Sequence, residues 1–176
     1  RLGQAIAVAM GREHHLRLMD TVAVEPPERS EFFAGDILDP DDAWRAVRGM
    51  DAVIHTAAPP QTLPEEELER ANALLEWTTR GTHVLLSAAV EAGVRRCVYA
   101  GTLAIFRDYP DDVYISENWK PLPRPEMGEM SNYLGELVCQ EFAREKRLTC
   151  TSLRLGELVL EEEVEGQTAD LMWLDP

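Results

Sequence analysis

Several residues with chemically useful side chains come directly after short apolar runs. Asp20 closes LRLMD, Asp36 follows EFFAG, and Thr102 follows RCVYAG. A carboxylate can accept hydrogen bonds from hydroxyl groups, and a threonine hydroxyl can donate one to a substrate oxygen. The alternatives are an exposed aspartate at a turn and a threonine that bonds only its local backbone. These residues are therefore candidates for ligand binding, and their role depends on the elements that position them.

The stretch DAVIHTAA, residues 51–58, is predicted to be the central element. Its apolar, β-branched run suits a strand over 51–57 that is buried on both faces of a parallel sheet. In open α/β sheets, ligands bind beyond the carboxyl ends of such strands, where the strand order reverses. We therefore expect any cofactor to lie near Thr56, Ala57 and Ala58.

Strands alternate with helices along the chain. Hydrophobic spacing, caps and turn residues predict helices over 2–12, 40–48, 65–93 and 130–146, the third loosened at Gly81, and strands over 16–20, 31–34, 51–57, 96–101 and 148–155. An irregular connection over 106–124 and an acidic tail from Glu157 complete the chain. This alternation implies right-handed βαβ crossovers, and hence a single domain over 1–176 with a doubly wound parallel sheet covered on both faces.

Composition excludes several classes of protein. A net charge of -15 over 176 residues disfavours nucleic acid and anionic membranes as partners. We find neither an apolar run of the roughly 20 residues that span a membrane nor a secretory signal, and we expect a cytoplasmic protein. Cys97, Cys139 and Cys150 lack metal-ligand spacing and lie in apolar stretches, so we expect reduced core thiols without disulfides. The four histidines show no ligand spacing either, so no metal site is predicted.

Four local sequences together carry a resemblance to a known family. Gly3 before a helix matches the last glycine of a G-x-x-G-x-x-G turn, and GDILD at 35–39 is similar to G-D-[IL]-x-D. HTAA at 55–58 follows the next strand, and YAGTLAIF at 99–106 is similar to V-Y-x-S-[ST]-x-x-V-Y. Over nearly all its length the chain resembles the extended short-chain dehydrogenases/reductases of the NAD-dependent epimerase/dehydratase type. The resemblance implies a Rossmann-like fold that binds NAD.

The resemblance assigns the first cofactor contacts to Gly3 and Asp20. In the family, a glycine at this helix start lets the backbone approach the pyrophosphate; for Gly3 alone, a simple helix boundary is the alternative. Asp20 lies 17 residues later, where an acidic residue accepts hydrogen bonds from the adenosine ribose and repels a 2′-phosphate. NAD is therefore expected over NADP.

The remaining cofactor contacts implied by the resemblance lie after the next two strands. Asp36 stands where the family binds the adenine amino group, with Ile37 beside it. Thr56, Ala57 and Ala58 stand where small residues let the cofactor lie against the backbone. By itself GDILDP is only a strand-to-helix turn; in combination these residues predict one dinucleotide site.

The catalytic residues of the family are only partly present. Thr102 stands at the position of the catalytic Ser or Thr. The family's Y-x-x-x-K supplies an acid/base Tyr and a Lys that lowers its pKa and binds the nicotinamide ribose. Here Gly128 and Asn132 take those positions, and neither Lys120 nor Lys146 has a tyrosine four residues before it. We keep Asn132 as a cofactor-binding candidate.

A neighbouring tyrosine is an alternative acid/base. Tyr133 lies beside Asn132, but one residue on a helix rotates a side chain by about 100°, which favours a packing role for it. The usual hydride-transfer mechanism is therefore in doubt.

Two functions follow from these residues. The first is an oxidoreductase or epimerase with altered acid/base residues, acting on a sugar nucleotide or another small hydroxyl or carbonyl compound. The second is a catalytically inactive NAD-sensing or regulatory protein; a scaffold that binds no dinucleotide is a third possibility. Family members commonly form homodimers through the two long helices, here 65–93 and 130–146. We also expect a first strand before Arg1 and a substrate-binding portion after Pro176.

Overall fold

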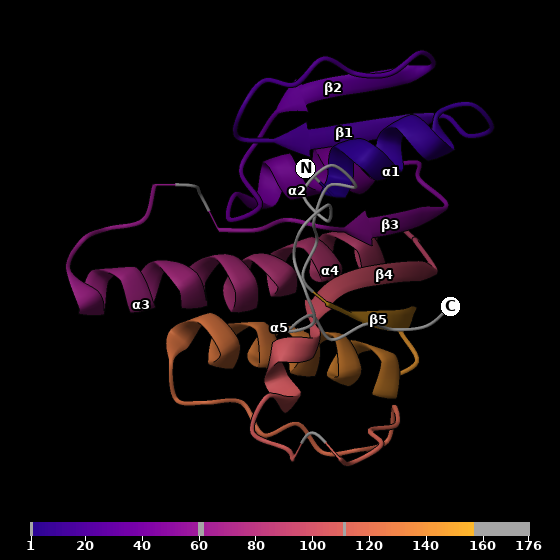
Figure 1. Cartoon of the computed structure of the whole chain (residues 1–176). Helices are drawn as coiled ribbons and strands as arrows, with labels where there is room; N and C mark the ends of the chain where they lie inside the picture. The colour runs from indigo at the N-terminus through magenta and orange to yellow at the C-terminus, as the bar shows by residue number, and fades with distance from the viewer. Residues whose placement is uncertain (1, 60–61, 111, 157–176) are drawn as a thin grey trace, which may run out of the picture.

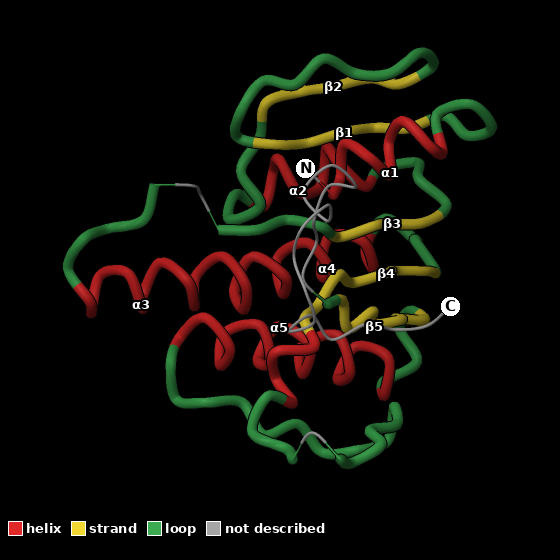
Figure 2. Tube along the Cα trace, viewed as in Figure 1, coloured by secondary structure: helices red, strands yellow, loops and turns green. Residues whose placement is uncertain are grey.

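The computed structural model describes residues 2–59, 62–110 and 112–156 (Figures 1 and 2). Its strands alternate with helices, as the sequence predicts. In chain order the elements are α1 (Leu2–Met10), β1 (Leu16–Asp20), β2 (Ser30–Ala34), α2 (Pro40–Val47), β3 (Ala52–His55), α3 (Glu67–Leu75), a π-helical turn (Glu76–Arg80), α4 (Gly81–Glu91), β4 (Arg96–Thr102), a 3₁₀ turn (Leu103–Phe106), α5 (Met127–Arg144) and β5 (Thr149–Leu155).

The described strands pair in parallel and form two sheets. β1 pairs with β2, so that Asp20 lies opposite Ala34. In the second sheet β4 lies between β3 and β5, and His55 of β3 lies opposite Tyr99 of β4. Figure 1 shows the strands stacked in the order β2, β1, β3, β4, β5. The parallel α/β fold is confirmed. β1 and β3 are not paired with each other, so the described residues make two sheets.

The helices α2, α4 and α5 pack side by side into one layer. Two clusters of buried residues join this layer to the strands. The first lies around α2 and α4 and the second between α4, α5, β4 and β5. Buried members of the first are Ile37, Ala43, Val47, Leu85, Ala88, Ala89 and Val94, and those of the second are Leu86, Cys97, Tyr99, Cys139 and Leu148.

Side chains alternate between the two faces of the three-stranded sheet. Val53 and His55 point into the helical layer, where Val53 packs against both clusters and His55 is buried. Ile54 and Leu153 lie on the other face and are 38% and 46% exposed. Within the described residues this sheet is therefore covered on one face, and the prediction that the strand at 51–57 is buried on both faces is not met.

The long helix predicted over 65–93 is interrupted by the π-helical turn. The α-helical form resumes at Gly81, the first residue of α4. A Cβ added to Gly81 would lie 2.9 Å from Cγ2 of Ile37. Glycine therefore lets α4 start in close contact with the core residue Ile37. The other helices occur where they are predicted, with boundaries that differ by about two or three residues.

The start of α2 follows its predicted capping. Asp39 Oδ1 accepts hydrogen bonds from the N–H groups of Asp41 at 2.8 Å and Asp42 at 3.4 Å. Pro40 occupies the first turn, where its missing N–H has no helical partner to lose. No helix in the described ranges is both long and apolar enough to cross a lipid bilayer.

Candidate functional site

The start of α1 lies against the turn that follows β3. A Cβ atom added to Gly3 would lie 2.8 Å from Oγ1 of Thr56, closer than side chains normally approach. Glycine therefore lets the helix start reach the carboxyl end of β3. The first N–H groups of a helix have no intrahelical partners and, together with the helix dipole, favour an anion. Gly3 and Thr56, both predicted cofactor contacts, are thus brought together.

His55 fixes the turn that contains Thr56, Ala57 and Ala58. Its ring is 3% exposed, and Nε2 lies 2.9 Å from Oγ1 of Thr82. The Thr82 hydroxyl donates its hydrogen to a carbonyl one helical turn back, so Nε2 must carry the proton that joins the two side chains. Nδ1 is then an acceptor, and it receives the Ala57 N–H at 3.3 Å.

Burial lowers the pKa of His55 to about 4, so the imidazole is neutral at neutral pH. The sequence analysis placed His55 in the HTAA segment but gave it no role of its own. The position of His55 at the end of an apolar strand could have indicated this role, because a buried polar ring needs hydrogen-bond partners.

Asp20 lies at the exposed carboxyl end of β1. Its backbone carbonyl accepts the Gly35 N–H at 3.1 Å, which holds the ends of β1 and β2 together. One carboxylate oxygen accepts the Val22 N–H at 3.1 Å. The exposed side chain has one oxygen engaged in this turn, and its other oxygen makes no hydrogen bond among the described residues.

Asp36 and Ile37 follow β2, and their side chains lie in different surroundings. Oδ1 of Asp36 accepts the Leu38 N–H at 2.8 Å, and the Asp36 N–H donates to Oδ2 of Asp42 at 2.9 Å. Ile37 is 2% exposed and packs in the core between α2 and α4. Of these two predicted cofactor contacts, Asp36 has a partly exposed carboxylate, whereas Ile37 has only its backbone to offer.

Thr102 is the last residue of β4. Its Oγ1 accepts the Ala104 N–H at 3.1 Å and so begins the 3₁₀ turn. This is the local backbone bond named as the alternative to a catalytic role. Because the hydroxyl acts as an acceptor there, its hydrogen can still be donated to another group.

Gly128 and Asn132 lie in the first turns of α5 and are joined to each other. Asn132 Nδ2 donates to the Gly128 carbonyl at 2.7 Å. Among the described residues, apart from the two chain neighbours and the local helix backbone, no atom lies within 4 Å of a Cβ added to Gly128. The position therefore has open space for a larger side chain, and Asn132 uses its amide within the helix.

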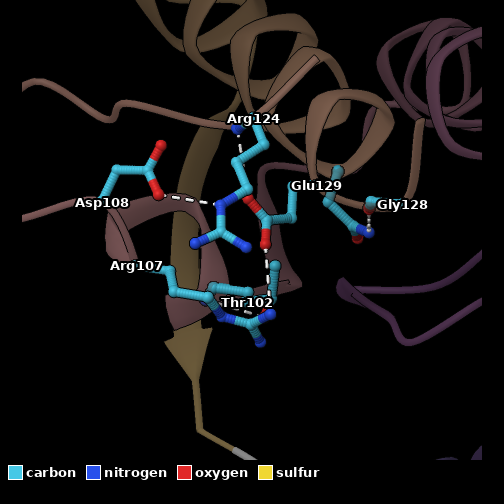
Figure 3. A network of polar contacts seen from close by, with 8 residues as sticks. Thr102, Arg107, Asp108, Arg124, Gly128 and Glu129 are labelled. Carbon is cyan, nitrogen blue, oxygen red and sulfur yellow. Dashed lines mark hydrogen bonds and ion pairs between the residues drawn. The ribbon is translucent and has the colours of Figure 1, made fainter. Parts of the chain in front are cut away.

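Glu129, next to Gly128, is the buried centre of a charged network that the sequence analysis missed. Figure 3 shows its carboxylate between Arg107 and the backbone of Arg124. Glu129 is 8% exposed, accepts the Arg124 N–H at 3.1 Å and lies 3.5 Å from the Arg107 guanidinium. Arg124 in turn donates to Asp108 at 2.8 Å. The network joins the end of the 3₁₀ turn to the start of α5, and no spacing in the sequence indicates it.

A second network, centred on Arg154, contacts the irregular connection over 106–124. Arg154 on β5 donates two hydrogen bonds to Glu136 on α5, at 3.1 and 2.7 Å, and Glu136 is 2% exposed. The same guanidinium lies 4.8 Å from the centre of the Phe106 ring and donates to the Glu117 carbonyl at 3.1 Å. Arg154 thus holds the segment that follows Thr102 at two points, Phe106 and Glu117.

The sequence matches the family model of the NAD dependent epimerase/dehydratase family over residues 3–172. The chain belongs to this family. One curated relative is the NAD-dependent glucose-6-phosphate dehydrogenase of Haloferax volcanii. It is 24% identical to this chain over an alignment of 192 residues, gaps included, which covers 99% of the chain and 71% of that enzyme.

Solved structures show the same fold. A mutated uronate dehydrogenase superposes with a TM-score of 0.75 at 25% identity, over 88% of this chain and 55% of that one. A short-chain dehydrogenase/reductase superfamily protein from Agrobacterium tumefaciens with bound NAD superposes with a TM-score of 0.73 at 25% identity, over 88% of this chain and 45% of that one. The chain thus spans about half of these structures, and only 26% of another curated relative.

Proposed function

We propose that this epimerase/dehydratase family member binds NAD at the edge formed by Gly3, Asp20, Asp36 and the turn after β3. The observation that carries the proposal is the contact between the start of α1 and Thr56, because it places free helix N–H groups at the end of a parallel strand. The exposed carboxylate of Asp20 fits a ribose and opposes the 2′-phosphate of NADP.

The chemistry that fits best is an oxidoreductase or epimerase reaction on a sugar nucleotide or another small hydroxyl or carbonyl compound, with altered acid/base residues. Thr102 would donate its hydroxyl hydrogen to the substrate oxygen. NAD, when bound, would supply the hydride acceptor. Because Gly128 has no side chain and Asn132 carries no charge, proton transfer would need a group other than the family's Tyr and Lys.

The alternative is a catalytically inactive protein that binds NAD as a sensor or regulator. The absence of the Tyr and Lys pair favours it, since general acid/base groups contribute about 10²–10⁴-fold to reaction rates. In this reading the Gly3, Asp20 and Asp36 site is unchanged, and only the reaction is lost.

Binding and turnover by the full-length protein separate the two functions. We expect calorimetry to show that NADH binds and that NADPH binds much more weakly. Asp20→Ser should reduce the difference in affinity between the two dinucleotides. Steady reduction of NAD with any of a panel of sugars and sugar nucleotides would support the enzyme, and NADH binding without turnover would support the sensor. Binding of neither dinucleotide would refute both functions.

We also propose a cytoplasmic homodimer that uses the two long helices predicted over 65–93 and 130–146. In the structure the first corresponds to α3, the π-helical turn and α4, and the second to α5. These helices pack together within the chain, and Leu68 on α3 is 66% exposed. Light scattering on the full-length protein should give twice the chain mass, and Leu68→Glu should shift it toward the monomer. A monomer at all concentrations would refute the proposal.

A further inference from the structure

The three cysteines of the sequence meet in one place in the core. Cys97 on β4 and Cys150 on β5 lie opposite each other in neighbouring strands. Cys139 on α5 belongs to the same buried cluster, against which Cys150 packs. All three are free thiols, and they come from three elements that are distant in sequence. The fold therefore creates a cluster that the spacing of the cysteines did not indicate.

The three thiols are not equivalent in exposure. Cys97 and Cys139 are 1% and 0% exposed, whereas Cys150 is partly exposed. Among the described residues Cys150 is therefore the member of the cluster most open to a small reagent.

The thiols also differ in acidity. Hydrogen bonding with the neighbouring thiols of Cys139 and Cys97 lowers the pKa of Cys150. The same contact with Cys150, together with burial, raises the pKa of Cys97 and Cys139. Cys150 thus lies beside two thiols of higher pKa, which is the arrangement of an attacking cysteine beside resolving cysteines.

The geometry allows a disulfide between these residues. Neighbouring strands lie about 4.8 Å apart, which is within the range of Cα separations in disulfides. The described residues hold no group of three or more His, Cys, Asp or Glu that could bind a metal ion.

We propose that Cys150 is an oxidation site, at which a hydroperoxide produces a disulfide with one of the two neighbouring thiols. The Cys150 thiolate attacks the peroxide oxygen, the O–O bond breaks, and a sulfenic acid and hydroxide (or alkoxide) form. The thiol of Cys97 or Cys139 then attacks the Cys150 sulfur, the S–O bond breaks, and the disulfide and water form. The peroxide is reduced by two electrons, and the two sulfurs are oxidised.

The first test uses the native full-length protein without oxidant. Brief labelling with iodoacetamide at pH 7, followed by peptide mass mapping, should modify Cys150 at least about tenfold faster than Cys97 or Cys139. Equal labelling of the three cysteines, or slowest labelling of Cys150, would overturn the proposal.

The second test adds hydrogen peroxide, denatures the protein and alkylates the remaining thiols. We expect a peptide pair linked through Cys150, which dithiothreitol restores to free thiols. C150A should prevent the linkage, whereas at least one of C97A and C139A should retain it. No linkage in the wild type, or a Cys97–Cys139 linkage in C150A, would refute the proposal; circular dichroism checks that each variant is folded.

Discussion

His55 is a buried, neutral imidazole whose two nitrogens are both used by the structure. Nε2–H joins Thr82, and Nδ1 accepts the Ala57 N–H. A protonated ring could not accept that N–H, so acid would break the bond that shapes the turn after β3. His55 is therefore a positioning residue for the candidate cofactor site.

The lowered pKa of His55 makes stability depend on pH. Its folded pKa of about 4 lies below the ordinary 6.5, so between these values the unfolded chain takes up a proton that the folded chain does not. Stability is fully present above pH 6.5 and should fall by about 3 kcal/mol as the pH drops to 4. Urea unfolding of the full-length protein across this range measures the effect.

The matched variant for this experiment is His55→Gln. In this variant the number of protons taken up on unfolding between pH 6.5 and 4 should be smaller by one, even if the free energy of unfolding at pH 7 is lower. An unchanged pH dependence in this variant would mean that His55 is not the group that titrates.

The open space at Gly128 allows the missing catalytic pair to be installed. In the part of the chain that the structure describes, nothing beyond the chain neighbours and the local helix backbone lies within 4 Å of the added Cβ, so Gly128→Tyr should be accommodated. Asn132→Lys gives up only a bond within the helix. With both changes we expect NAD-dependent turnover to rise by about a hundredfold or more. Steady-state kinetics of the double variant and of each single variant measures it. No gain, with NADH binding retained, would mean that these positions do not face the reacting atoms.

Among the elements, β5 and α5 are joined by the buried pair of Arg154 and Glu136. Arg154→Met would leave the Glu136 carboxylate buried without its partner, which costs about 3–5 kcal/mol. It would also release the Glu117 carbonyl, so hydrogen exchange in the segment 107–124 should increase. Urea unfolding and exchange mass spectrometry on the full-length protein measure the two effects.

The control for this pair is Arg144→Met. Arg144 and Glu141 form a pair on the surface of α5 whose side chains are 66% and 64% exposed. Because solvent screens this exposed pair, removing it should leave the free energy of unfolding nearly unchanged and should not alter exchange in 107–124. Equal losses in the two variants would contradict the view that the buried pair anchors this segment.

The elements that sequence could predict are those with local signals. Asp39 and Pro40 cap α2 as expected, and the apolar spacing of α5 places it correctly. The sequence did not predict the helix type of two turns, the 3₁₀ turn after Thr102 and the π-helical turn before Gly81. The π-helical turn leads to Gly81, which lies against the distant residue Ile37, a contact that no local pattern contains.

For the whole molecule, the alternation of strands and helices predicted the parallel α/β fold. Short motifs predicted which strand ends carry the candidate site, and the structure joins Gly3 to Thr56 and the end of β1 to the end of β2. The Glu129 network could not be predicted, because its members come together only when the 3₁₀ turn and α5 are placed. The meeting of the three cysteines has the same origin.

The central claim is that the start of α1 and the turn after β3 bind the dinucleotide. The most direct test is calorimetric titration of NADH into the full-length protein, into Gly3→Val and into Ala9→Val, which changes an exposed residue of the same helix. A side chain at position 3 must displace Thr56 and cover the helix start, so we predict that Gly3→Val weakens NADH binding by at least about tenfold, or 1.4 kcal/mol, while Ala9→Val binds like the wild type. NADH binding of equal strength in all three proteins, or in none, would contradict the claim.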